Sequence, residues 1–199
     1  MSDTTPLLAT VQLAAPGLRL RPWETSDIDA LYEAAVESLD TVGRWLPWCH
    51  PGYVRDDARA WVELCRSSWP GGEHYAFAIV DDEGRLLGDI GLNHFDHPQR
   101  RANMGYWIRR TAQGRGIVPR AAKAVAAFGF EALRLQRIEI IAAVDNTASR
   151  RCAEKAGAHF EGIGRHRLTI ANQPVDAAMY SLLPSDLIQP ADAQSSAMS

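Results

Sequence analysis

The sequence is poor in features that mark membrane and secreted proteins. No apolar run approaches the ~20 residues that a helix needs to span a bilayer. The N-terminus has no basic stretch followed by an apolar one, so we expect no signal peptide. Excess charge of one sign is also missing, because the net charge is −3 at pH 7. We therefore expect neither a nucleic acid nor an anionic membrane as partner.

Cysteine is scarce, and two nucleotide-binding patterns are missing. The three cysteines, Cys49, Cys65 and Cys152, are an odd number without metal-type spacing. They favour reduced thiols in a cytoplasmic protein over a disulfide framework. The Gly-x-x-x-x-Gly-Lys-Ser/Thr loop of NTPases does not occur. A repeating βαβ alternation is absent as well, which argues against a doubly wound nucleotide fold.

The composition is that of an ordinary globular domain. The chain has 199 residues, of which 46% are hydrophobic and 23% charged, enough for one domain with a real core. No repeat or linker divides the middle of the chain. We expect a loose N-terminus over residues 1–13, a single domain over 14–184 and a flexible tail over 185–199.

A glycine-rich turn is the most informative local feature. A strand-like segment, 102–109, leads into Gln113-Gly114-Arg115-Gly116-Ile117, and an alanine-rich helix follows. Glycines at 114 and 116 lack Cβ atoms, so main-chain N–H groups can approach a phosphate closely. The helix N-terminus adds unpaired N–H groups and a partial positive charge. Many such turns merely redirect the chain, but this context favours a pyrophosphate site that needs neither metal nor lysine.

The order of expected elements predicts the fold class. Strand-like patterns and helical patterns alternate irregularly, with one hairpin turn at 81–84. We expect strands at 18–23, 75–80, 85–93, 102–109, 137–144, 158–165 and 177–183, and helices at 25–35, 39–46, 56–69, after 117, and 146–156. This order predicts an α+β protein with a mixed, mostly antiparallel central sheet flanked by helices.

These motifs together resemble a known superfamily. The Gln-Gly-Arg-Gly-Ile turn at 113–117, followed by Asp145-Asn146 and Lys155-Ala156-Gly157, is similar to the GNAT superfamily of acetyl-CoA-dependent N-acetyltransferases. Three further pieces resemble its Rim-type branch, which acetylates the N-terminal amine of ribosomal proteins. They are Arg44-Trp45-Leu46-Pro47-Trp48, Gly105-Tyr106-Trp107-Ile108, and Asp145-Asn146-x-x-Ser149 leading to Phe160-Glu161-Gly162. The resemblance covers roughly residues 16–184.

The resemblance implies a GNAT-like fold with acetyl-CoA as co-substrate and no metal. Main-chain groups near Ile108 and Arg109 would bind pantetheine, and N–H groups of 113–117 would hold the pyrophosphate. Asn146 would hold the pantetheine arm or a water, and it could cap the helix at the same time. Ser149 would donate a proton or hydrogen bond to the leaving sulfur. The implied cofactor-binding residues are Ile108, Arg109, Gln113, Gly114, Arg115, Gly116, Ile117, Asn146 and Ser149.

The sequence departs from the family pattern at three positions. Thr111 stands where Gln or Arg is usual, and Ala153 where a tyrosine is common. Leu168 occupies the position of a carboxylate proposed as base in one Rim-type enzyme. The cofactor part therefore carries over well, whereas the base does not.

His94 is the preferred candidate for the base, because imidazole titrates near neutrality and follows the strand at 85–93. Asp96 and a chain of water molecules stay open as alternatives. The group His94-x-Asp96-His97 is not expected to bind a metal, since no fourth ligand is evident.

The aromatic segment between the first strand and the hairpin supplies candidates for the acceptor site. Trp45 and Trp48 flank Leu46-Pro47, and in the family this region borders the acceptor. They could form one wall of an amine pocket, although each tryptophan could equally fill the core.

Three functions remain open from the sequence. The preferred one is acetyl transfer to a protein or peptide N-terminus. The alternatives are acetylation of a small-molecule amine, such as an antibiotic, polyamine or amino acid derivative, and a non-catalytic acyl-CoA-binding module. The resemblance also raises a homodimer, which the sequence does not decide.

Overall fold

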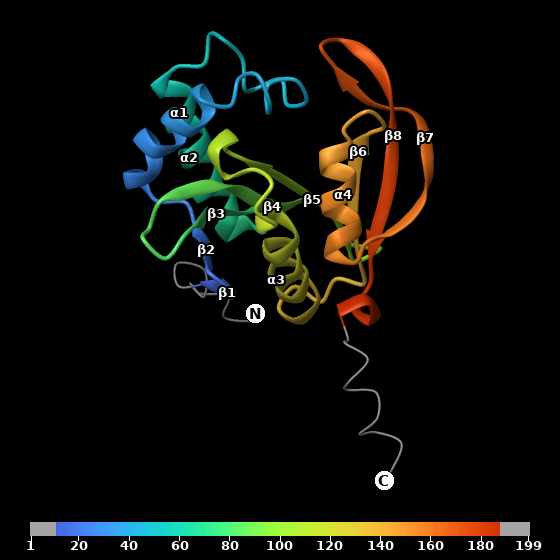
Figure 1. The fold of residues 1–199 in the computed structure, drawn as a ribbon. Coiled ribbons are helices and arrows are strands. Elements are labelled where there is room, and N and C mark those ends of the chain that lie inside the picture. Colours follow the sequence, from blue (N-terminus) through green and yellow to red (C-terminus); the bar gives the residue numbers. More distant parts are fainter. Residues whose placement is uncertain (1–10, 188–199) are drawn as a thin grey trace.

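The structure is a computed structural model that describes residues 11–187. Its centre is one eight-stranded sheet with the order β1-β2-β3-β4-β5-β6-β8-β7 (Figure 1). The strands are β1 Leu13–Ala15, β2 Leu18–Pro22, β3 Tyr75–Val80, β4 Leu86–Asp96, β5 Arg101–Ile108, β6 Arg137–Ala143, β7 His159–Ile170 and β8 Gln173–Leu182. The expected mixed, mostly antiparallel sheet is confirmed.

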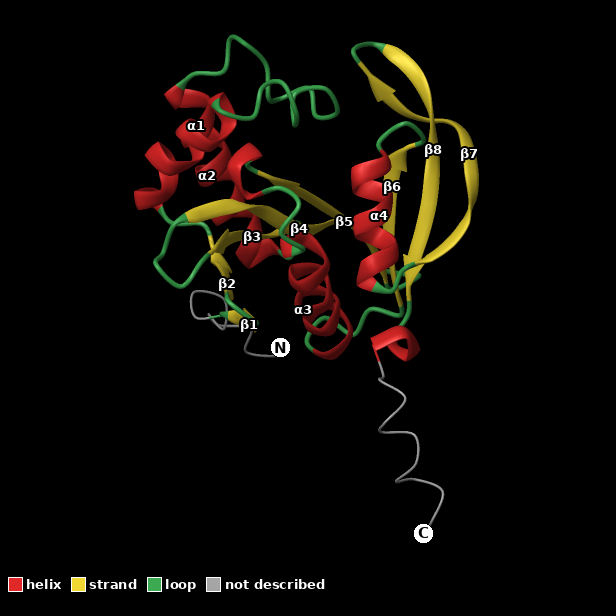
Figure 2. Cartoon of the chain, in the orientation of Figure 1, coloured by secondary structure: helices red, strands yellow, loops and turns green. Residues whose placement is uncertain are grey.

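Helices cover both faces of the sheet (Figure 2). They are α1 Ile28–Val36, α2 Arg55–Gly71, α3 Ile117–Glu131 and α4 Thr147–Ala156, with short 3-10 turns at Thr25–Asp27, Arg110–Ala112 and Pro184–Leu187. Helices α3 and α4 pack into one apolar cluster, whereas α1 and most of α2 pack into another. None of the helices in the described part of the chain is long and apolar enough to cross a membrane.

Strand β3 shows how the sequence pattern builds these two clusters. Side chains of a strand alternate between the faces of the sheet. Phe77 and Ile79 accordingly enter the cluster beneath α3, while Ala76, Ala78 and Val80 enter the cluster beneath α1. All five are buried, as expected of a strand in the middle of a sheet that is covered on both faces.

The sheet opens between β5 and β6. These two strands run parallel and pair only at Arg101↔Arg137, Ala102↔Ile138 and Asn103↔Glu139. Beyond these pairs β5 follows β4, while β6 pairs with β8, so the strands separate. Figure 1 shows the resulting split, with β1–β5 on one side and β6, β8 and β7 on the other. The split exposes main-chain groups on the inner edges of β5 and β6.

Some expected boundaries are wrong. The expected helix at 39–46 is a series of turns, with Val42 N–H bonded to Ser38 O at 2.8 Å and Leu46 N–H to Val42 O at 2.9 Å. The backbone packs closely at Gly43, where a Cβ would lie 2.3 Å from Cys49 O. The strand expected at 158–165 continues to Ile170, and that expected at 177–183 begins at Gln173, so a long hairpin forms.

The expected ends of the domain fall partly outside the described residues. Strand β1 begins at Leu13, and residues 11 and 12 precede it without regular structure. The last described element, Pro184–Leu187, begins the expected tail. The division into a domain at 14–184 and two loose ends stays a prediction.

Candidate functional site

A cavity of about 770 Å³ lies where β5 and β6 separate. Its walls come from the end of β5, the end of β6, the turn before α3, and the first turns of α4. The loop residues 44–47 and the β7 residues 168–170 line another part. The described structure thus brings segments far apart in the sequence around one opening.

The glycine turn forms one wall of this cavity. Gly114 has a φ of +75° and Gly116 a φ of +66°, the left-handed conformation that favours glycine. A Cβ at either position would meet nothing within 4 Å, so the space in front of the turn is open. Gly116 is the N-cap of α3 and makes no side-chain cap hydrogen bond. The first N–H groups of α3, like those of any helix, lack intrahelical partners, and the first turn of this helix lines the cavity.

Part of the turn already has partners within the protein. Gln113 N–H donates to Arg110 O at 3.3 Å, and its side-chain amide donates to Ile108 O at 3.1 Å. Arg115 lines the cavity beside the glycines. The main-chain N–H and the side-chain amide of Gln113 are therefore engaged within the protein.

Arg109 is held by other protein groups rather than free to bind a ligand. Its N–H donates to Leu87 O at 2.9 Å, and its guanidinium donates to Glu37 at 3.1 and 2.5 Å and to Leu86 O at 3.0 Å. Because successive N–H groups of a strand point to opposite edges, that of Ile108 points into the split.

Asn146, Ser149 and Tyr106 form a hydrogen-bonded group at the start of α4. Asn146 Oδ1 accepts from Ser149 N–H at 3.1 Å, so Asn146 is a helix cap. Ser149 Oγ lies 3.1 Å from Tyr106 Oη, which also donates to Ser149 O at 3.0 Å. Burial raises the pKa of Tyr106, so its hydroxyl keeps its proton at neutral pH. Sequence reasoning missed Tyr106, although it lies in the Gly-Tyr-Trp-Ile motif.

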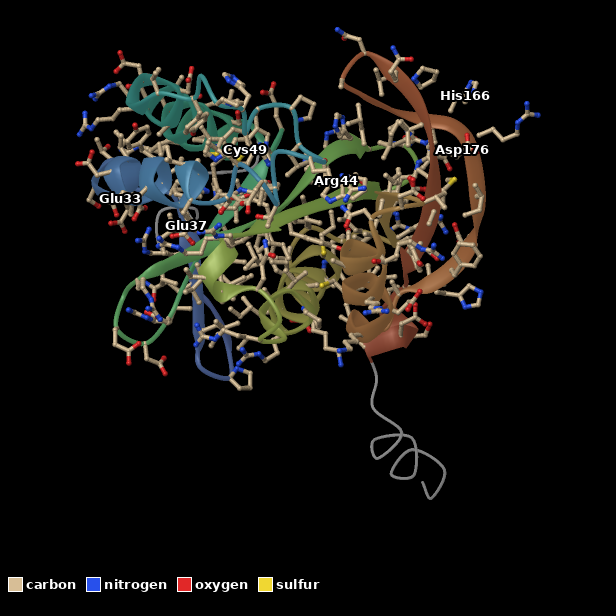
Figure 3. The ribbon with its side chains drawn as sticks, turned by 45° about the horizontal axis from the view of Figure 1, so that its top comes forward. Glu33, Glu37, Arg44, Cys49, His166 and Asp176 are labelled. Carbon is tan, nitrogen blue, oxygen red and sulfur yellow. The ribbon has the colours of Figure 1, made fainter. Side chains whose placement is uncertain are left out.

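The two tryptophans of the acceptor segment lie in different places. Trp45 lines the cavity, and the Arg44 guanidinium carbon lies 4.7 Å from the centre of its ring. Trp48 instead packs against Trp107 and Tyr53, with ring centroids 5.3 and 5.6 Å away. Figure 3 shows Arg44 on the loop and His166 across from it on the β7–β8 hairpin. Trp48 therefore packs against Trp107, which itself lines the cavity, and does not line the cavity itself.

His94 lies outside the cavity lining, on an irregular part of β4. It is exposed and has a φ of +50° next to a register shift in the β4–β5 pairing. Its neighbour Asn93 lines the cavity and accepts from Asn103 Nδ2 at 2.9 Å. Asp96, the alternative base, forms an ion pair with Arg101 at 2.9 Å.

A second histidine, which sequence reasoning missed, lies near the same place. His74 Nε2 is 3.3 Å from where a Gly91 Cβ would be. Gly91 pairs with Gly105 on the neighbouring strand, and Gly105 lines the cavity. Neither glycine carries a side chain that would separate the His74 imidazole from the cavity. Burial, and then the charge of His94, lower the pKa of His74. No sequence pattern marks His74, because only the register of β3 and β4 brings it there.

The remaining candidates are placed as follows. Leu168 lines the cavity where the family resemblance would put a carboxylate. The His97 ring stacks on Phe95, with centroids 5.7 Å apart. Within residues 11–187, no group of three or more His, Cys, Asp or Glu side chains could hold a metal ion.

Comparisons with known proteins agree with this geometry. Residues 17–159 match the family described as acetyltransferase (GNAT) domain. A putative ribosomal N-acetyltransferase of Bacillus subtilis, YdaF, is 32% identical over 171 residues, which are 83% of this chain and 91% of that protein.

Two solved structures are similar over most of the chain. A putative ribosomal-protein-serine acetyltransferase from Vibrio cholerae has a TM-score of 0.79 and 27% identity, with coverage of 89% of this chain and 100% of that one. RimJ of Mycobacterium smegmatis, in complex with CoA-disulfide, has a TM-score of 0.78 and 25% identity, with coverage of 94% and 92%.

Proposed function

Because the chain belongs to the GNAT acetyltransferase family, and so is an N-acetyltransferase that uses acetyl-CoA, we propose that its acceptor is the N-terminal amine of a protein or peptide. The observation that carries this proposal is the cavity between β5 and β6. An uncapped, open glycine turn forms one of its walls, and the Trp45 loop and the β7–β8 hairpin lie on either side of another part. The ribosomal acceptors in the names of similar proteins add support.

The residues of the cavity fit acetyl-CoA. The N–H groups after Gly114 and the side chain of Arg115 suit a pyrophosphate, since they combine helix-terminus donors with a positive charge. The N–H of Ile108 suits a carbonyl oxygen in the split. When bound, acetyl-CoA supplies the acetyl thioester that the amine attacks. One preorganised donor such as the Ile108 N–H is typically worth about 10²–10³ in rate.

Ser149 is proposed to pass a proton to the leaving sulfur. Its Oγ lies beside the cavity and 3.1 Å from Tyr106 Oη, which also donates to Ser149 O and so orients the serine. Asn146 fixes the Ser149 backbone by capping α4. The Asn146 amide nitrogen stays a candidate contact to the pantetheine arm.

The proton of the amine has two candidate acceptors. We retain His94, which is exposed next to cavity-lining Asn93. His74 is the second, because its lowered pKa keeps the imidazole neutral and able to accept.

The pH dependence of kcat/KM in His74→Asn and His94→Asn separates the two. The acidic limb is the fall in kcat/KM at low pH, where the base is protonated. If only one variant loses this limb, the histidine replaced in that variant is the group that takes the proton from the amine. If His74 acts, the wild-type limb lies below the ordinary pKa of histidine. An unchanged limb in both variants would exclude both residues.

The first experiment follows free-thiol release from acetyl-CoA with a panel of N-terminal peptides and small amines. Turnover confined to peptides is expected. Turnover on polyamines or other small amines alone would overturn the proposed acceptor. CoA binding without thiol release with any acceptor would favour an acyl-CoA-binding module.

Two further properties are proposed. A protein acceptor of ribosomal origin would place the enzyme in the cytoplasm. The homodimer that the family resemblance raises would be tested by gel filtration.

A further inference from the structure

Glu37, the residue after α1, joins the two sides of the cavity. We propose that Glu37 is a positioning residue. It couples the glycine turn at 113–117, where acetyl-CoA would bind, to the loop at 40–47 that carries Trp45. Binding of acetyl-CoA would then order this loop. This inference rests on the proposed function of the glycine turn and adds a regulatory link between its two substrates.

The Glu37 carboxylate receives four hydrogen bonds from the turn region. Arg109 Nε and Nη2 donate at 3.1 and 2.5 Å. Thr111 donates through its N–H at 3.0 Å and its hydroxyl at 2.8 Å, both to Oε1. Thr111 thus has a use in this chain, where the family more often has Gln or Arg. The contacts join residues more than 70 positions apart in the sequence.

Neighbouring residues extend the same junction. Ser38 is buried, donates to Ala34 O at 2.6 Å and accepts from Arg110 N–H at 3.0 Å. Arg110 also pairs with Asp40 at 3.2 Å. We call this set of contacts between residues 37–40 and 109–111 the latch. It consists of three consecutive residues of the turn bonded to three residues at the start of the loop.

The latch connects directly to cavity residues on both sides. Asp40, Thr41 and Val42 line the cavity and lead to Trp45. On the other side, Ala112 and Gln113 follow Thr111 and lead to the glycines. A ligand that restricts the motion of the glycine turn is therefore expected to restrict residues 109–111 and, through the latch, residues 37–40 at the start of the loop. Hydrogen-bonded elements transmit such ordering.

Glu37 is charged under any ordinary assay condition. Hydrogen bonds from Arg109 lower its pKa to about 2. Glu37→Gln keeps the size of the side chain but removes the charge that holds Arg109, so it is the appropriate change.

The chain offers a matched control in Glu161. Its carboxylate accepts from Arg137 at 2.7 Å and from Ser181 Oγ at 2.8 Å, and its pKa is also lowered to about 2. Glu161 and Arg137 join β7 to β6 and do not line the cavity. Glu161→Gln therefore removes an ion pair of the same chemistry that has no link to the loop.

The test is amide hydrogen exchange of the full chain with and without CoA. In wild type, CoA is expected to slow exchange in peptides from both 109–118 and 37–48, by at least about fivefold in each, the lower end of ordinary site-to-site coupling. In Glu37→Gln, slowing at 109–118 remains and slowing at 37–48 is lost. In Glu161→Gln, both segments respond as in wild type.

Each other outcome has a definite meaning. CoA that slows exchange at 109–118 but not at 37–48 in wild type would overturn the coupling and leave the proposed function intact. Failure of CoA to bind at all would overturn the proposed function, and the coupling with it. Retained slowing at 37–48 in Glu37→Gln would also overturn the coupling.

If Glu37→Gln does not fold, Thr111→Val serves as the second variant, since it removes one hydrogen bond and leaves the ion pair. It is expected to reduce the slowing at 37–48, and an unchanged response there would contradict the latch. A kinetic check accompanies either variant: the KM of the acceptor rises, whereas that of acetyl-CoA changes little.

Discussion

Two hydroxyl groups meet at the start of α4. Ser149 Oγ and Tyr106 Oη lie 3.1 Å apart, and the Tyr106 hydroxyl also bonds the Ser149 carbonyl oxygen. Tyr106 thus orients the residue that we propose as proton donor. Ser149 is expected to act on the sulfur directly, and Tyr106 to act only by positioning Ser149.

Substitution of each hydroxyl tests this order. Ser149→Ala is expected to lower kcat about 10²-fold, the lower end for loss of a general acid. Tyr106→Phe loses only the orientation and should have a smaller effect. Ser67→Ala, on an exposed position of α2, is the control and should leave kcat unchanged. A larger effect of Tyr106→Phe would make Tyr106 the donor.

A buried carboxyl group gives the fold its own pH dependence. Asp89 is 6% exposed, and its Oδ1 accepts from Trp23 Nε1 at 2.7 Å. Burial raises its pKa to about 7. Between about pH 4 and pH 7 the folded protein holds a proton that the unfolded chain has lost, so stability from this group falls as pH rises.

Asp89→Asn should remove this dependence. Relative to the variant, wild type is expected to lose up to about 1.4 kcal/mol of unfolding free energy per pH unit between about 4 and 7. Urea unfolding of both proteins at pH 5, 6, 7 and 8 measures the difference. A constant difference across that range would mean that Asp89 ionises normally.

Helix α3 depends on the backbone of its first turn. Gly116 caps the helix in the left-handed conformation, where a β-branched side chain is strained but asparagine is tolerated. Gly116→Val is expected to lower the unfolding free energy by about 1–2 kcal/mol. Gly116→Asn should cost less. Equal losses of unfolding free energy in the two variants, measured by urea unfolding, would mean that the size of the side chain and not the backbone φ sets the cost. That result would conflict with the open space around Gly116.

Elements with strong local patterns could be predicted from the sequence. The strand pattern of 75–80 and the alanine-rich pattern after 117 predicted a strand and a helix where both are found. The turns at 39–46 were expected as a helix, and no local pattern marks the close approach of Gly43 to Cys49 O. The same holds for the site. The glycine turn was visible in sequence, whereas Glu37, His74 and Tyr106 join it only through register and long-range contacts.

At the scale of the whole fold, residues 11–187 form two groups of strands joined at three residue pairs between β5 and β6. A ligand in the split contacts both groups, since the cavity is lined by residues of β5 on one side and of β6 and α4 on the other. Such a ligand binds the folded chain and not the unfolded one. It should therefore stabilise the protein by mass action.

Thermal unfolding measures this stabilisation. At 100 times its dissociation constant, CoA is expected to add about 2.7 kcal/mol. For a domain of this size that corresponds to roughly 5–10 °C in Tm. The Gly116→Val variant should show a smaller shift at the same CoA concentration. A wild-type Tm that does not respond to CoA would contradict binding in the split.

The contact between Trp48 and Trp107 has a spectroscopic consequence. Two indoles with centroids 5.3 Å apart and planes inclined at 62° couple their electronic transitions. Such coupling between chromophores in a fixed, chiral arrangement produces a pair of circular dichroism bands of opposite sign. Trp48 stands in the loop and Trp107 in the sheet, so the signal reports how the loop sits on the strand. Circular dichroism can therefore follow the position of this loop on the sheet in real time and without a label.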